Sequence, residues 1–158
     1  MAGFLEEKIE EALIAGESRT AIVKKFKGAE EPQRLLFHLN NISNPAIRGK
    51  FFYHNLLLTL ALLFVTSKKL LTVVQFGAFD LFLFMSLVPV VINFYLLREI
   101  LRFRRIGYQF LMVLAPLSLL LPENRAIPEL PLTLVMTGLS LYLYLRLFPK
   151  RDLIKSID

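Results

Sequence analysis

The sequence contains no cysteine, and this absence excludes a disulfide-bonded scaffold, a thiolate zinc site and a cysteine nucleophile. Histidine is nearly as rare, with two residues, His38 and His54. The HExxH, GxSxG and P-loop motifs are missing, as is any aspartate cluster suited to a metal and a pyrophosphate. His54, beside Tyr53 and Asn55, has no acidic neighbour in the sequence that could complete a catalytic pair. We therefore expect a protein that is not an enzyme and that uses no cofactor and no metal.

Charged residues are scarce beyond position 50. Residues 1–50 hold eight of the 19 Lys and Arg and seven of the 13 Asp and Glu, which leaves 11 and 6 for the other 108 positions. Overall, 55% of the residues are hydrophobic and 20% are charged, against about 45–50% and about 25% in soluble domains. Long apolar runs with charge at their ends exclude an ordinary water-soluble globule and predict an all-α integral membrane protein.

Four apolar segments are candidates for membrane-spanning helices, because a span needs about 20 mostly apolar residues, within a range of about 17–25. The first segment ends at Lys68 and Lys69, and the third is the shortest and is interrupted by Pro116. We expect the four to form a helical transmembrane bundle over residues 46–158. The segments are residues 51–66, 70–97, 108–121 and 130–148.

The positive charges that flank these segments predict their orientation, because cytoplasmic flanks collect Lys and Arg. Clusters lie before the first span, between the second and third, and after the fourth, and four spans place all three clusters on one side. We therefore expect four crossings with both termini cytoplasmic. Lys68 and Lys69 then lie outside, so spans one and two could instead form a shallow hairpin that does not fully cross. The clusters are Arg48 and Lys50; Arg98, Arg102, Arg104 and Arg105; and Arg146, Lys150, Arg151 and Lys155.

Residues 1–45 are predicted to form a cytosolic module of three short amphipathic helices. Residues 1–11 are acidic and have no apolar core, so we expect no secretory signal there. Ser18 is a candidate N-cap of the second helix, and Gly16 and Gly28 are expected to end the first and second helices. Apolar residues at helical spacing predict the buried faces. These faces are Leu5, Ile9, Ala12 and Leu13; Ile22, Val23 and Phe26; and Leu35, Leu36, Leu39 and Ile42.

The spacing of Gly16, Ser18 and Ile22 has the character of a helix-turn-helix, which raises nucleic-acid binding as an alternative. The helix that would enter a groove, residues 30–41, carries two acids and offers only Arg34 besides a histidine. DNA affinity rests largely on Lys and Arg contacts to phosphates. We therefore expect no nucleic-acid partner and interpret the module as a docking element.

Polar residues within the predicted second span are the candidates for an intramembrane site. Asp80 lies well inside this span, where an unpaired charge costs at least about 2.5–3.5 kcal/mol. Gln75 and Asn93 share one stripe with Ser86 at about 100° per residue, and Asp80 lies about 120–140° away from it. This separation argues against one continuous polar path and favours helix packing. Asp80 is therefore either a structural group or an ion site.

The predicted fourth span carries small hydroxyl residues on one face. Such residues let transmembrane helices approach closely and form hydrogen bonds across the contact. We expect this stripe to pack against another helix of the chain or of a second copy. Its members are Thr133, Thr137, Ser140 and Tyr144.

The basic segment between the predicted second and third spans is a candidate contact for anionic lipid headgroups. Arginines near the cytoplasmic surface attract such lipids by about 1 kcal/mol each. The candidate residues are Arg98, Arg102, Arg104 and Arg105.

Two functions of different classes follow from these expectations. The leading one is an assembly or accessory subunit of the bilayer, which acts in a homo-oligomer or with a partner membrane protein through its cytosolic helices and polar span faces. The alternative is an oligomeric channel or transporter for an ion, a proton or a small solute that uses Asp80. Flux in liposomes with and without Asp80→Asn separates the two.

Overall fold

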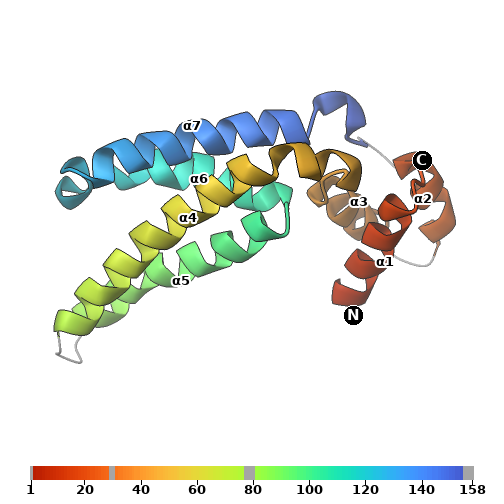
Figure 1. Ribbon diagram of the computed structural model, residues 1–158. Helices are drawn as coiled ribbons and strands as arrows, with labels where there is room; N and C mark the ends of the chain where they lie inside the picture. Colours follow the sequence, from red (N-terminus) through yellow and green to blue (C-terminus); the bar gives the residue numbers. More distant parts are fainter. Residues whose placement is uncertain (1, 29–30, 77–80, 155–158) are drawn as a thin grey trace.

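The computed structural model describes residues 2–28, 31–76 and 81–154, and these ranges are built from helices (Figure 1). No β-strand occurs within them, and an isolated bridge joins Ile42 and Arg104. The all-helical class predicted from the sequence is confirmed. The elements are α1 (Ala2–Ile14), α2 (Arg19–Phe26), α3 (Pro32–Asn41), α4 (Pro45–Phe76), α5 (Leu81–Leu101), α6 (Arg105–Ser118), the 3-10 helix η1 (Pro122–Arg125), α7 (Glu129–Leu147) and the 3-10 helix η2 (Lys150–Asp152).

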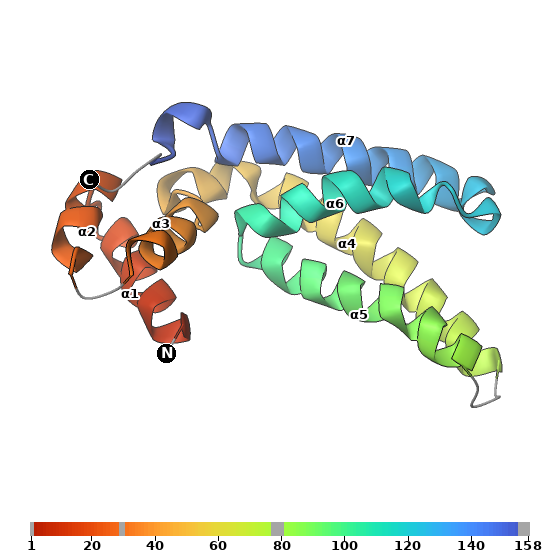
Figure 2. The ribbon, with the colours of Figure 1, turned by 180° about the vertical axis from the view of Figure 1, so that it is seen from behind.

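Three helices, α4, α5 and α7, are long and apolar enough to cross a membrane. Helix α7 coincides with the predicted fourth span, 130–148, within one residue at each end. Helix α6 overlaps the predicted third span, 108–121, but its 14 residues cover only about 21 Å, against a hydrocarbon core of about 30 Å. It packs against both α5 and α7 (Figure 2). The structure thus gives three candidate spans where the sequence predicts four.

The predicted boundary between the first and second spans is wrong. Helix α4 continues through Lys68 and Lys69 to Phe76, so residues 70–76 belong to the same helix as the first predicted span and do not begin the second. Lysine is a good helix former, and Lys68 forms an ion pair with Glu129 at the start of α7. The two lysines therefore interrupt the apolar run without ending the helix.

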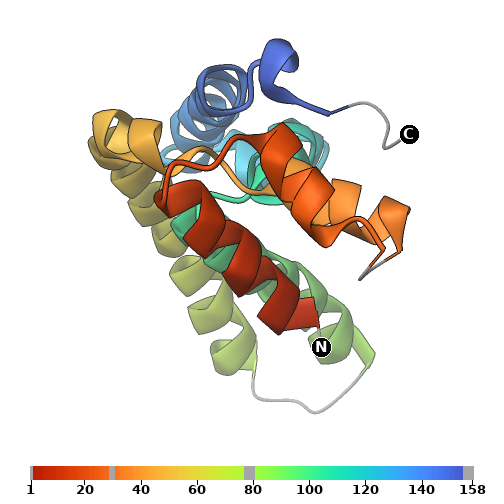
Figure 3. The same ribbon diagram turned by 90° about the vertical axis from the view of Figure 1, so that its right-hand side faces the viewer.

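The bundle consists of two antiparallel pairs, α4 with α5 and α6 with α7. The pairs meet near α3 and diverge toward the opposite end (Figures 1 and 2). Figure 3 shows that α1–α3 lie across the end of the bundle at which the pairs meet. The start of α4, the turn between α5 and α6, and the end of α7 all lie at this end, and with them the basic residues Arg48, Arg104 and Arg146.

Two hydrophobic cores stabilise the molecule, one inside the bundle and one among α1–α3. The eight buried residues of the second core all belong to the faces predicted from helical spacing. Ser18 caps α2 as expected, since its Oγ accepts a hydrogen bond from the Ala21 amide at 3.2 Å. Gly16 and Gly28 have φ angles of 83° and 98°, which favour glycine at the ends of α1 and α2. The second core comprises Leu5, Ile9, Ala12, Leu13, Ile22, Leu35, Leu39 and Ile42.

The turn between α5 and α6 positions the basic segment. Phe103 has a φ of 53° and donates its amide to the Ile100 carbonyl at 2.9 Å, while the Arg104 amide donates to the Glu99 carbonyl at 2.9 Å. This pairing is a Schellman cap, which reverses the chain direction directly after a helix. A Cβ at Gly107 would lie 3.0 Å from the backbone nitrogen of Ile100. Glycine therefore lets α6 begin in close contact with the last turn of α5.

Candidate functional site: the charged junction and the interhairpin groove

The junction between α1 and the bundle is an ion-pair network built on two glutamates of α1. Glu10 lies 2.5 Å from Nη1 of Arg48 on α4 and 3.4 Å from Nη2 of Arg104. Glu6 lies 3.1 Å from the same Arg104 nitrogen and 3.0 Å from Nδ1 of His38 on α3. Residues four apart share one face of a helix, so both carboxylates point away from the core of α1–α3 toward the bundle. The network joins α1, α3, α4 and the α5–α6 turn.

Arg104 occupies the centre of this network and is 1% exposed, whereas the side chains of Glu6 and Glu10 are 17% and 24% exposed. Burial lowers the pKa of Arg104 from its ordinary value, and the carboxylates of Glu6 and Glu10 oppose this shift. Its Nε and Nη1 atoms are buried without a hydrogen-bond partner among the described residues. The buried charge is thus stabilised mainly through Nη2, which contacts both acids.

Hydrogen bonds at the end of α3 connect this helix to α2 and to the bundle. Arg19 on α2 donates from its two Nη atoms to the carbonyls of Leu39 and Ile42, at 2.5 and 2.7 Å. Carbonyls in the last turn of a helix lack helical partners, so these bonds satisfy them. Asn41 Oδ1 accepts the amide of Ile106 in the first turn of α6 at 3.0 Å. These contacts bind α2 to α3 and α3 to the bundle.

The four arginines predicted to contact anionic lipid have different surroundings. The side chains of Arg98 and Arg102 are 66% and 41% exposed and remain accessible. Arg105 is half-buried and donates to the hydroxyl of Tyr144 at 2.9 Å, with its guanidinium 5.6 Å from the centre of that ring. The prediction of a lipid contact is wrong for Arg104, because the acids of α1 neutralise it inside the protein.

The hydroxyl stripe of α7 lies in a helix contact within the chain. Thr133 and Ser140 are 3% and 0% exposed. The hydroxyls of Thr137 and Ser140 donate to carbonyls of their own helix at 2.8 and 2.9 Å, which satisfies them without a partner across the interface. Tyr144 instead accepts from Arg105 at the start of α6. The stripe therefore serves packing inside the bundle.

The three polar candidates for an intramembrane site are not collected on one helix. Asp80 lies outside the described residues. Gln75 is exposed on α4, whereas Asn93 is half-buried on α5. The prediction that Gln75 and Asn93 share a stripe is wrong, because α4 ends at Phe76 and α5 begins at Leu81.

A buried hydrogen-bonded pair that links α4, α5 and α6 was not predicted. Asn55 donates from Nδ2 to the Ile100 carbonyl at 3.0 Å, and the Tyr108 hydroxyl donates to Asn55 Oδ1 at 2.6 Å. An amide in an apolar run indicates such a bond, because an unsatisfied polar group in the membrane is costly. The identity of the partners depends on tertiary contacts.

A groove opens between the two helix pairs on the side away from α1–α3, and we call it the interhairpin groove. It comprises two adjacent cavities of about 270 and 570 Å³ that share part of their lining. The inner, smaller cavity is lined by all four bundle helices and η1, and the mouth is lined by α4, α5, the η1 segment and the start of α7. The residues that line both cavities are Val65, Lys69, Pro89, Leu121, Asn124 and Glu129.

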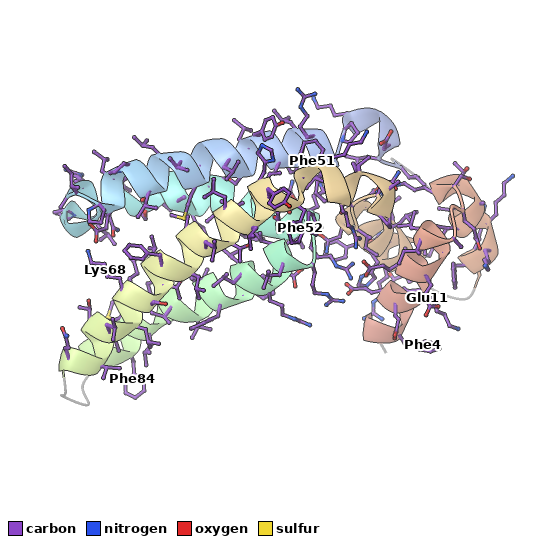
Figure 4. The ribbon with its side chains drawn as sticks, viewed as in Figure 1. Phe4, Glu11, Phe51, Phe52, Lys68 and Phe84 are labelled. Carbon is purple, nitrogen blue, oxygen red and sulfur yellow. The ribbon has the colours of Figure 1, made fainter. Side chains whose placement is uncertain are left out.

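Two lysines and one glutamate carry the charge of the described groove lining. Lys68 projects from α4 toward the other helix pair (Figure 4) and forms its ion pair with Glu129, whose side chain is 15% exposed. Lys69 is half-buried, lines both cavities, and forms no ion pair with the described residues. The described lining therefore carries two positive charges and one negative charge. This pairing across 61 residues was also missed from the sequence.

The described residues contain no group of three His, Asp or Glu side chains that could hold a metal ion. Three helices that are long and apolar enough to cross a membrane indicate a helical membrane protein. Comparisons with protein-family models, with curated proteins and with solved structures find no match for the chain.

Proposed function

We propose that the chain is a four-pass integral membrane protein with both termini in the cytoplasm. Helix α6 runs from the end near α1–α3 toward the opposite end, as α4 does. A bilayer that surrounds the bundle therefore also surrounds α6. A bilayer can thin around a short helix at a modest cost. The basic clusters at the α1–α3 end support a cytoplasmic position for that end. Residues 1–45 then form a cytosolic module.

In this proposal the protein acts as a non-enzymatic assembly or accessory subunit. The observation that carries it is the exposure of large apolar side chains on the cytosolic helices, with Phe4, Ile14 and Phe37 at 63%, 66% and 52%. Large apolar side chains that are exposed to water indicate a surface that binds a partner. The ion-pair network holds α1 and α3 on the bundle, and a preorganised surface loses less entropy on binding.

The membrane-facing surface supports contacts with other chains. Only 33%, 28% and 28% of the residues in the candidate spans α4, α5 and α7 are buried inside the molecule. The remaining faces are available to lipid, to a partner helix or to a second copy. Because the hydroxyl stripe of α7 is used inside the bundle, a contact between copies would employ other faces.

Copurification from native membranes after chemical crosslinking tests the accessory role. The double variant Phe4→Ser with Phe37→Ser should lose a stoichiometric partner or a second copy, because it removes exposed apolar area. A matched control, Glu11→Ser with Arg34→Ser, changes exposed polar residues on the same helices and should retain the partner. Capture of no protein by the natural chain, or equal capture by both double variants, would refute the role.

Flux measurements in liposomes test the competing class of function. The natural chain and Asp80→Asn should both leave a proton or cation gradient intact if the protein is an accessory subunit. A gradient that the natural chain dissipates and that Asp80→Asn preserves would replace the accessory role with a conduit.

A further inference from the structure

The interhairpin groove has the size and lining of a site for one amphiphilic molecule. Its cavities of about 270 and 570 Å³ compare with the range of about 300–1,000 Å³ that is usual for small-molecule sites. The inner cavity is lined mostly by apolar side chains, among them Leu62, Ile92 and Met136. Lys68 lies at the mouth, and Lys69 and Glu129 lie where the two cavities share their lining. Such a division suits a ligand with one polar end and one apolar end.

The mouth of the groove lies at the depth expected for lipid headgroups. Helix α7 has 19 residues, and its length of about 28 Å is close to the hydrocarbon thickness of about 30 Å. Glu129, its first residue, therefore lies at one boundary of the hydrocarbon, and Lys68 shares this depth because it pairs with Glu129. Leu62 and Met136 lie about two turns deeper along α4 and α7, at the level of the acyl chains.

The charged side chains at the mouth indicate which charge the polar end of the ligand carries. Glu129 compensates Lys68, whereas Lys69 has no ion-pair partner among the described residues. An ammonium at the edge of an apolar groove is stabilised by an anionic group. We propose that the groove binds one anionic phospholipid of the bilayer, with its phosphate at Lys69 and one acyl chain beside Leu62 and Met136. This site lies apart from the exposed apolar residues of α1 and α3 and requires only that the bundle is in a bilayer.

Fluorescence quenching can locate the lipid, because the chain contains no tryptophan. Phe64→Trp places a single tryptophan in the lining of the mouth. Phe84→Trp is the matched control at the same end of the bundle, because Phe84 is 62% exposed and projects away from the bundle (Figure 4). Both variants are reconstituted in phosphatidylcholine vesicles that contain increasing brominated phosphatidylglycerol or brominated phosphatidylcholine.

The expected result is that brominated phosphatidylglycerol quenches Phe64→Trp at a lower mole fraction than brominated phosphatidylcholine, while the two lipids quench Phe84→Trp equally. Lys69→Gln in the Phe64→Trp background should reduce this preference about fivefold, as expected for one charge near a membrane surface. Lys69→Arg should keep the preference, and so should Lys50→Gln, an exposed lysine at the other end of α4.

Two results would overturn the assignment. One is equal quenching of Phe64→Trp by the two lipids, which would show that the groove does not select an anionic headgroup. The other is a preference that persists in Lys69→Gln, which would place the selective charge elsewhere. The far-ultraviolet circular dichroism spectrum and the retained preference of Lys69→Arg distinguish loss of the site from loss of the fold.

Discussion

Arg104→Met removes the charge at the centre of the junction and keeps a side chain of similar length. The natural guanidinium is 1% exposed and contacts Glu6 at 3.1 Å and Glu10 at 3.4 Å. Without it, two carboxylates of α1 face the turn between α5 and α6 with one fewer cation. We therefore expect α1 to separate from the bundle more readily.

The size of the expected loss in stability depends on the ion-pair and hydrogen-bond partners that Glu6 and Glu10 keep in the variant. Removing one partner of a buried ion pair costs about 3–5 kcal/mol, because the remaining charge is left uncompensated. Here Glu10 keeps Arg48, Glu6 keeps Arg102 and His38, and both acids are partly exposed. We therefore expect a smaller loss in the free energy of docking α1, of about 2–3 kcal/mol.

Hydrogen exchange of the α1 amides measures this loss, because exchange reports the free energy of local opening. A loss of about 2–3 kcal/mol corresponds to exchange that is about 30–150-fold faster. Arg98→Met is the matched control, since the Arg98 side chain is 66% exposed and lies 3.9 Å from Glu99. It should change exchange less than about fivefold, as exposed ion pairs contribute about 0–1 kcal/mol.

A double-mutant cycle with Glu10→Gln tests whether the effect belongs to the network. The combined loss should be smaller than the sum of the single losses, because both changes remove the same interaction. Exchange of α1 within threefold of the natural chain in Arg104→Met, or an equal increase in Arg98→Met, would refute the role assigned to Arg104.

Further variants test the packing of the bundle and its topology in the membrane. Gly107→Ala should lower the free energy of unfolding by about 1–3 kcal/mol, because its Cβ would lie 3.0 Å from backbone. The control Gly138→Ala, with open space around it, should raise the free energy of unfolding by up to about 1 kcal/mol. Thermal unfolding in detergent measures both. Asn55→Leu should cost about 1–3 kcal/mol in the same assay, because it leaves buried polar partners unsatisfied, and an unchanged midpoint would contradict this. For the four-pass topology, an impermeant thiol reagent should label Ile127→Cys from outside intact cells and should label Thr20→Cys only after permeabilisation; the reverse pattern would invert the topology.

The sequence by itself determined the features that depend on residues close together in the chain. Leu5 and Ile9 are buried because helical spacing places them on one face, and Ser18 caps α2 because its hydroxyl reaches an amide three residues ahead. The fourth apolar run coincides with α7 because its boundaries are local changes in polarity. The apolar runs likewise predict a membrane protein, and three helices long and apolar enough to cross a membrane support this prediction.

Only the tertiary structure decided where charges meet across long separations in sequence. The sequence predicts that a helix ends at Lys68 and Lys69, because an uncompensated charge is costly in hydrocarbon. Glu129, 61 residues away, instead forms an ion pair with Lys68. The sequence predicts Arg104 at the lipid surface, but Glu10, 94 residues earlier, forms an ion pair with it inside the protein. The energy of an ion pair depends on the distance between the charges and on their burial. Both quantities are fixed by the packing of α1 on the α5–α6 turn and of α4 beside α7. The packing of α4–α7 likewise determines the groove between the two pairs.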